Sequence, residues 1–305
     1  MSADPQGPDD DGDPNDPIGL RAGALALGAS ILWGGNSVFI KIGLADMPPV
    51  ALAFCRFVLG AATVWCGARL FGERLGLRRG DSAGLLVLAG IFFVQILLLN
   101  MGTLYTTAGR STILMSAYPF FTALFAHFFL PGDRLSAAKV GGLCLAFLGV
   151  ALVFSESVRL AETRYMWGDL LVLASAAFLG MRHIALKKLV AGLHPFKVLF
   201  WQAGFSLPAF LLLSLLSEAD ASFSWNSGLA FALFYQGVVV AGLCFITWVF
   251  LLKRHSASRL GVYSFSTPIF GVLLSAALLD EPLSLVVLGG AGLVGLGIVA
   301  VNRAG

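Results

Sequence analysis

The sequence has little charge and no long polar region beyond its first residues. Only 12% of its 305 residues are Asp, Glu, Lys or Arg, whereas 58% are hydrophobic. Soluble domains are about 45–50% apolar and about 25% charged, so this composition argues against a water-soluble fold. The charged residues gather in short clusters. Apolar stretches of about 20 residues separate these clusters, and an α-helix needs that length to cross a bilayer.

Cysteine pairs and catalytic signatures are also missing. Cys55, Cys66, Cys144 and Cys244 stand singly within apolar stretches and form no CxxC pair, so neither a metal site nor a disulfide framework is predicted. No GxxxxGK[ST] phosphate-binding loop and no HExxH zinc motif occurs. We therefore expect no cofactor, no metal and no enzyme activity. Nucleic acid is not expected as a partner, because no basic stripe with interleaved aromatic residues is present.

Acidic side chains are absent from the middle of the apolar stretches. Asp169, Asp280 and Glu281 lie only at the ends of such stretches. A carrier that exchanges lipophilic cations for protons needs a buried acid that binds cation and proton alternately. Efflux of cationic drugs is therefore disfavoured.

The first 19 residues differ from the rest of the chain. They contain six Asp residues among Pro and Gly, and they have too few apolar side chains to offset the entropy cost of ordering. We expect residues 1–19 to form a disordered, acidic cytoplasmic tail. Because no basic segment precedes the first apolar stretch, that stretch is predicted to remain as a transmembrane helix and not to be cleaved as a signal peptide.

Ten apolar segments predict an all-α polytopic membrane protein whose main partner is the lipid bilayer. We expect transmembrane helices at residues 20–41, 49–69, 83–104, 110–130, 137–154, 166–186, 196–216, 227–251, 259–279 and 284–302. An even number of crossings places both termini on one side. With cytoplasmic termini, 14 of the 20 Lys and Arg residues fall inside and four fall outside, among them Arg110. This asymmetry predicts a multi-pass protein of the cell inner (plasma) membrane with both termini in the cytoplasm.

The second half of the chain is similar to the first at an offset close to 146 residues. Pro49 aligns with Pro195 and Gly34 with Gly180. At a slightly larger offset, Tyr118-Pro119-Phe120 aligns with Thr267-Pro268-Ile269. Several independent positions therefore indicate an internal repeat.

Each repeat would hold five helices. Because five is odd, two tandem copies enter the membrane in opposite orientations. We predict inverted repeats at residues 20–155 and 164–303. Two such halves can rock about a site near the midplane, so that the site opens to one side of the membrane at a time.

Short motifs in both repeats resemble the EamA-type carriers of the drug/metabolite transporter superfamily. The first repeat contains Leu32-Trp33-Gly34-Gly35-Asn36 in its first helix and Phe54-Cys55-Arg56-Phe57 in its second. The second repeat ends with Asp280-Glu281-Pro282-Leu283-Ser284 and a Gly-rich helix. The resemblance covers residues 20–302 and implies ten helices, two inverted EamA repeats and transport of a small metabolite. It does not name the cargo, because the substrates of the family are diverse.

Ionisable side chains within apolar helices are costly and often mark functional sites. Arg56 and Arg182 are two such side chains, and they favour a small-molecule substrate with an anionic group, such as the carboxylate of an amino acid. The alternatives are a structural charge for Arg56 and an interfacial anchor for Arg182. If the two repeats line one cavity, the predicted substrate-binding residues are Trp33, Asn36, Arg56, Gln95, Tyr118, Arg182, His183, Gln202, Gln236 and Tyr263.

Pro119 and Pro268 occupy matching positions in the two repeats, where each removes a backbone hydrogen bond. They are predicted to be either hinges or fixed kinks. The favoured function is a secondary carrier that exports amino acids or related metabolites by alternating access. An importer of a vitamin such as riboflavin and a non-transporting receptor or scaffold are the alternatives. The sequence is compatible with a monomer or a homodimer.

Overall fold

The computed structural model describes residues 18–78, 80–129, 137–159, 163–255, 260 and 262–303. These residues form helices joined by turns and short loops, and no strand occurs among them. The all-α fold expected from the sequence is thus confirmed. Apart from its last two residues, the tail expected at residues 1–19 lies outside the described residues.

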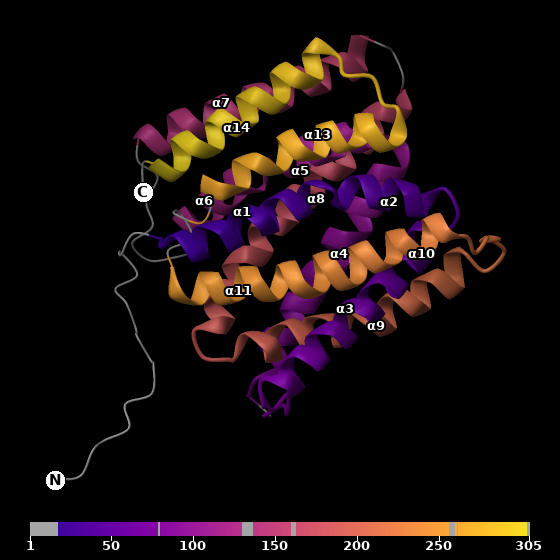
Figure 1. Cartoon of the computed structure of the whole chain (residues 1–305), viewed down its shortest axis with the longest axis vertical. Coiled ribbons are helices and arrows are strands. Elements are labelled where there is room, and N and C mark those ends of the chain that lie inside the picture. Colours follow the sequence, from indigo (N-terminus) through magenta and orange to yellow (C-terminus); the bar gives the residue numbers. More distant parts are fainter. Residues whose placement is uncertain are drawn as a thin grey trace.

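The helices follow one another along the chain as Figure 1 shows. In the first half they are α1 (Leu20–Gly34), α2 (Asn36–Leu44), α3 (Pro49–Leu70), α4 (Ser82–Tyr105), α5 (Ala108–Met115), α6 (Tyr118–Phe129) and α7 (Ala137–Arg159). In the second half they are α8 (Thr163–Val190), α9 (Pro195–Ser217), α10 (Ser227–Phe234), the π-helix η1 (Tyr235–Cys244), α11 (Phe245–Arg254), the 3₁₀ turn η2 (Val262–Phe265), α13 (Ser266–Leu279) and α14 (Leu285–Arg303).

Seven helical segments of the described chain are long and apolar enough to cross a membrane. They are Leu20–Leu44, Pro49–Leu70, Ser82–Tyr105, Ala108–Phe129, Tyr165–Val190, Pro195–Ser217 and Ser227–Lys253. Shorter apolar helices at Val140–Val153, Ser266–Leu279 and Leu285–Ala300 lie where the sequence predicts the fifth, ninth and tenth crossings. The chain is therefore a multi-pass membrane protein.

Successive crossings, some of which contain two helices, run in alternating directions. Their ends therefore lie on two opposite sides of the molecule (Figure 1). We call the side with the start of α1 and the end of α14 the terminal end, which lies at the left of Figure 1. The opposite side carries the turns between α2 and α3, α4 and α5, α9 and α10, and α13 and α14. We call it the distal end.

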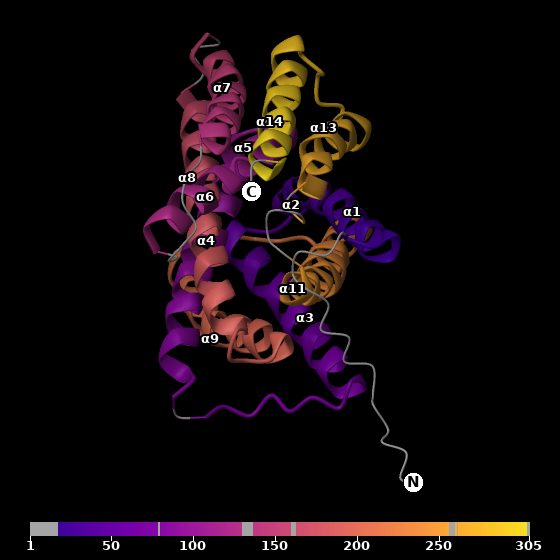
Figure 2. The ribbon, with the colours of Figure 1, turned by 90° about the vertical axis from the view of Figure 1, so that its left-hand side faces the viewer.

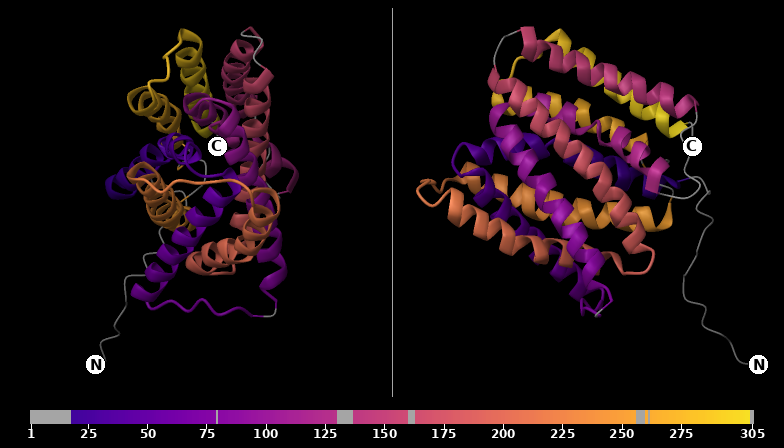
Figure 3. Two further views of the ribbon diagram at one scale, coloured as in Figure 1. Left: turned by 90° about the vertical axis from the view of Figure 1, so that its right-hand side faces the viewer. Right: turned by 180° about the vertical axis from the view of Figure 1, so that it is seen from behind.

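The two halves of the chain pack through matched pairs of helices. Helix α7 lies beside α14, and α3 lies beside α9. Figures 2 and 3 show these two pairs at opposite edges of the molecule, with the other helices between them. Helix α5 likewise contacts α13. Each helix in these three pairs contacts the one that the predicted repeat makes its equivalent, whereas α4 and α8, which also pack together, are not equivalents.

Two equivalent glycines allow close helix crossings near the middle of the protein. A Cβ atom on Gly34 of α1 would lie 2.8 Å from the carbonyl oxygen of Thr267 in α13. A Cβ atom on Gly180 of α8 would lie 2.7 Å from the backbone nitrogen of Thr122 in α6. Both distances are too short for a side chain, so these helices can approach one another only because the positions hold glycine.

Several helices are interrupted near mid-length. Helix α1 ends at Gly34 and α2 begins at Asn36, and α5 is separated from α6 in the same way. Pro119 is the second residue of α6 and Pro268 the third residue of α13. In a first turn the backbone N–H has no partner within the helix, so proline is tolerated there. The two prolines therefore follow breaks in the helices, and a hinge role for them stays a prediction.

A salt bridge at the terminal end gives a testable pH dependence. Lys197 Nζ donates to Asp81 Oδ2 at 2.5 Å and joins the start of α9 to the start of α4. This hydrogen bond holds the pKa of the Asp81 carboxyl below its ordinary value. Such a group adds stability above its unfolded pKa of about 4, and the contribution is lost as the pH falls through the lower folded value. We expect the difference in melting temperature between wild type and Asp81→Asn to be present at neutral pH and to shrink below about pH 4. A difference that stays constant down to low pH would contradict this assignment.

Candidate functional site

A cavity lies between the two halves of the chain. It contains about 840 Å³ of space free of atoms, which includes the open solvent at its mouth. On the distal side the lining reaches Thr112 in α5. Toward the terminal end it reaches Leu199 in the first turns of α9. The cavity lining thus covers the middle part of the helices.

Seven of the ten predicted binding residues line this cavity. They are Trp33, Asn36, Arg56, Gln95, Tyr118, Arg182 and His183. They come from six helices, namely α1, α2, α3, α4, α6 and α8, which the fold brings together from distant parts of the sequence. Substrate contact by these side chains stays a prediction.

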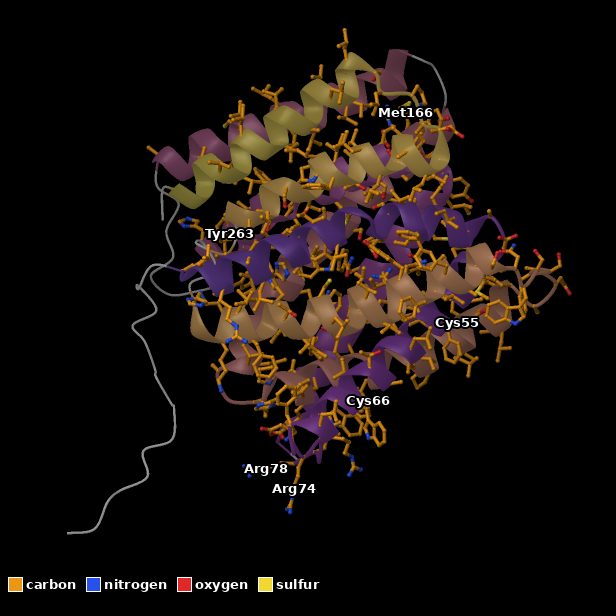
Figure 4. All side chains as sticks on the ribbon, viewed as in Figure 1. Cys55, Cys66, Arg74, Arg78, Met166 and Tyr263 are labelled. Carbon is orange, nitrogen blue, oxygen red and sulfur yellow. The ribbon has the colours of Figure 1, made fainter. Side chains whose placement is uncertain are left out.

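The other three predicted residues lie outside the cavity lining. Gln202 stands behind Arg182, and its Oε1 accepts a hydrogen bond from Arg182 Nε at 2.9 Å. Gln236 Nε2 donates to the backbone oxygen of Phe39 at 2.8 Å and so links η1 to α2. Tyr263 packs in an apolar cluster toward the terminal end (Figure 4). Gln202 therefore supports a cavity residue, whereas Gln236 and Tyr263 belong to helix packing.

Arg56 is a buried charge whose Nε and Nη1 atoms have no hydrogen-bond partner among the described residues. Its side chain is only 1% exposed. The guanidinium lies over the ring of Phe57, with Cζ 4.8 Å from the ring centroid. An unpaired charge is costly in the protein interior, so Arg56 requires water or a ligand from the cavity.

Arg182 is held on several sides. Besides its bond to Gln202, its Cζ lies 4.7 Å from the ring centroid of Phe92 and 4.8 Å from that of Phe245. Contacts between a cation and an aromatic face stabilise a desolvated guanidinium. The Phe92 ring also meets the Phe57 ring edge to face at 4.6 Å. These rings therefore connect Arg182 to Arg56, and both arginines line the same cavity.

Two side-chain amides of the cavity lining carry oxygen atoms that could accept a hydrogen bond. Asn36 Oδ1 and Gln95 Oε1 are buried and lack a hydrogen bond within the described chain. The amide nitrogen of Gln95 donates to Ser175 Oγ at 3.1 Å, which fixes the orientation of its side chain. The cavity therefore offers both hydrogen-bond donors and acceptors to a ligand.

The remaining walls are mainly aromatic and aliphatic. Trp33 and Trp248 meet edge to face at 5.0 Å, and Tyr118 meets His183 in the same way at 5.0 Å. Few polar groups set in an apolar wall are typical of a site that orients a small organic molecule. Such walls suit an apolar or aromatic substituent on the ligand.

Some lining residues were not among the predicted ones. Thr267 lines the cavity, and the repeat alignment already pairs it with Tyr118, so the sequence held a signal for it. Phe245 also lines the cavity. An apolar residue in an apolar helix gives no sign of which neighbour it faces, so no comparable signal existed for Phe245.

Arg110, which the charge distribution counts among the residues outside the membrane, is buried in the structure. Arg110 lies in the first turn of α5 and is 3% exposed. It forms a salt bridge of 2.6 Å with Asp169 in α8, which is 0% exposed. Arg110 also donates to the backbone oxygen of Val153 at 2.7 Å, and the Thr106 hydroxyl donates to Asp169 at 2.6 Å. These bonds form a buried polar layer near the distal end of the protein.

Three other charged residues bind helix ends at the distal end. Glu281 accepts two backbone N–H bonds from the start of α5 at 2.6 and 2.9 Å. Glu218 accepts two from the start of α3 at 2.8 and 2.9 Å. Lys41 Nζ donates to three carbonyl oxygens at the end of α4 at 2.6, 2.9 and 3.1 Å. Each charge has the sign that the helix dipole favours, and the two glutamates tie the second half of the chain to the first.

Comparison with known proteins gives consistent matches over nearly the whole chain. A family model described as the EamA-like transporter family matches residues 20–155 and 166–303. A relative from Salmonella typhimurium LT2 is 30% identical, with 91% of this chain and 93% of the relative aligned, and it is named a probable amino-acid metabolite efflux pump. A protein of the same name from Escherichia coli K12 is 29% identical over 87% of this chain and 89% of the relative.

Two further matches extend this comparison. A relative from Streptantibioticus cattleyicolor, named a probable terminal-alkyne amino-acid exporter, is 28% identical over 90% of both chains. One solved crystal structure, 20% identical, superimposes with a TM-score of 0.69 and covers 93% of this chain and 98% of its own. At that identity the structure supports the fold alone.

Proposed function

This chain belongs to the EamA-like transporter family, and we propose that it is a secondary carrier that exports an amino acid or a related carboxylate by alternating access. The relatives named as efflux pumps and exporters support the direction of transport. The lack of a phosphate-binding loop fits a carrier driven by a gradient.

The proposed architecture has ten crossings in two inverted repeats, at residues 20–155 and 164–303. The matched helix pairs α7–α14, α3–α9 and α5–α13 support this arrangement. We further propose that the carrier lies in the inner membrane of the cell and that its terminal end faces the cytoplasm. Exposed arginines of the loop between α3 and α4, including Arg74 and Arg78 (Figure 4), fit a cytoplasmic loop.

The observation that carries the proposal is a buried Arg56 that lines the cavity and whose Nε and Nη1 atoms have no hydrogen-bond partner among the described residues. At the distal end, Glu218 and Glu281 of the second half bind helix ends of the first half. In the proposed cycle this state receives substrate from the cytoplasm. The bonds of Glu218 and Glu281 then break as the two halves rock, and the cavity opens at the distal end.

Exchange in proteoliposomes tests this function. Purified protein would be reconstituted into liposomes loaded with unlabelled amino acids, their N-acetyl and 2-hydroxy derivatives, or riboflavin. We expect labelled carboxylates to exchange faster than in protein-free liposomes. Ser116 lines the cavity, so a Ser116→Trp variant should block exchange by filling it. Absence of exchange for every compound would refute a carrier, and exchange of riboflavin alone would favour the vitamin importer.

A further inference from the structure

The charge of the cavity is unbalanced. Its lining includes Arg56 and Arg182, and none of its described lining residues is Asp or Glu. Two acids at the distal end are already engaged, because Asp169 pairs with Arg110 and Glu281 binds the start of α5. Protonation of His183, which also lines the cavity, would add a charge of the same sign. The cavity lining is therefore positively charged.

A zwitterion cannot neutralise this charge. In an α-amino acid the ammonium group is attached to the carbon that bears the carboxylate. When the carboxylate binds Arg56, the ammonium must remain within a few ångströms of a guanidinium, in a site where low local polarity strengthens repulsion. Arg182 lines the same cavity and adds to that repulsion. A ligand with net negative charge avoids this cost.

The two unpaired acceptors do not need a cation. Asn36 Oδ1 and Gln95 Oε1 are neutral amide oxygens, buried and without a hydrogen bond in the described chain. A neutral N–H or O–H group satisfies such an oxygen. An N-acyl amino acid supplies a carboxylate and an amide N–H on adjacent atoms, and a 2-hydroxy acid supplies a carboxylate and a hydroxyl. The aromatic wall near Trp33 and Trp248 can receive the side chain.

We infer that the cavity selects monoanionic carboxylates whose nitrogen is acylated or replaced by a hydroxyl, and that it disfavours the parent zwitterions. This inference rests on the proposed carrier function and narrows its substrate class. Arg56 binds the carboxylate, Asn36 and Gln95 accept from the neutral donor, and Arg182 sets the net charge of the site.

A matched set of ligands separates charge from shape. The set shares one aromatic ring. It consists of a zwitterion (phenylalanine), two monoanions (N-acetylphenylalanine and 3-phenyllactate) and a cation (phenethylamine). Binding to the purified wild-type protein would be followed by tryptophan fluorescence, since Trp33 and Trp248 line the cavity. We expect the two monoanions to bind at least about tenfold more tightly than phenylalanine and the amine to bind most weakly.

Asn36→Asp provides a matched reversal of charge. The substitution preserves size and places a carboxylate at the unpaired Asn36 oxygen. We expect phenylalanine to gain affinity and N-acetylphenylalanine to lose affinity, so that the preference reverses. Asn36→Leu is the control, because it removes the oxygen without adding charge and should weaken binding without reversing the order.

The wild-type comparison does not depend on either variant folding. Binding of phenylalanine as tightly as its N-acetyl derivative would overturn the charge preference, even if both compounds are exchanged across liposomes. Exchange of no compound would overturn the carrier function itself. The inference is also overturned if Asn36→Asp is folded and leaves the wild-type order of affinities unchanged.

Discussion

Replacement of Asp169 by asparagine is expected to lower the free energy of unfolding by about 3–5 kcal/mol, because it leaves a buried arginine without a counter-charge. Asp169 is 0% exposed and Arg110 is 3% exposed, and their salt bridge measures 2.6 Å. Asparagine can still accept a hydrogen bond from Arg110 but cannot neutralise its charge. Denaturant unfolding of the purified protein in detergent micelles would measure the loss.

Two controls separate the buried pair from a general effect of removing charge. The double variant Arg110→Met/Asp169→Leu removes both buried charges, and it should recover most of the lost stability. Glu73→Gln alters a partly exposed pair, in which Glu73 lies 3.3 Å from His194, and pairs of that kind contribute below about 1 kcal/mol. If Asp169→Asn costs no more than Glu73→Gln, the salt bridge does not stabilise the distal end.

The helix positions followed from apolar length, because the bilayer imposes it on every crossing. The expected segments 83–104 and 196–216 lie close to α4 (Ser82–Tyr105) and α9 (Pro195–Ser217). Breaks within a crossing were harder to locate. The separation of α5 from α6 leaves the apolar run nearly unchanged, and only Pro119 marked it in the sequence.

The burial of charge at the distal end was not predicted for a related reason. Arg110 follows a short polar turn, and the charge distribution counted it among the residues outside the membrane. Its partner Asp169 is far away in sequence, in another helix. Glu218 and Glu281 likewise lie beyond helix ends, and the helices that they cap come from the other half of the chain. Such long-range pairings depend on which helices pack together, and a single sequence does not reveal this.

The residues predicted for the cavity divide into those that line it and those that face other helices. Arg56 and Arg182 stood out because a charge in an apolar helix demands an explanation, and both line the cavity. Gln236 and Tyr263 were predicted from polarity and depth, yet they face other helices. Depth follows from the position in an apolar run, whereas the direction of a side chain follows from helix rotation, which weak amphipathicity does not fix.

Replacement of Arg56 by glutamine is expected to weaken binding of a carboxylate ligand by about 10–100-fold. Hydrogen bonds to charged groups contribute about 1.5–3 kcal/mol, and about 1.4 kcal/mol corresponds to tenfold in affinity. Affinity would be measured by tryptophan fluorescence, with exchange in proteoliposomes as the second readout. Arg56→Lys, which keeps the charge but loses the planar fork of donors, should retain part of the affinity.

Stability in the absence of ligand distinguishes this role from a structural one. Arg56 makes no hydrogen bond to any described residue, so glutamine removes an uncompensated buried charge and should leave the unfolding midpoint unchanged or higher. Arg182→Gln is the matched control, because Arg182 is bonded to Gln202 and packed between Phe92 and Phe245. Its replacement should lower the midpoint. If the Arg56→Gln variant is destabilised but still binds and exchanges carboxylates normally, Arg56 is a structural charge. If the variant loses binding and keeps its stability, Arg56 binds the ligand.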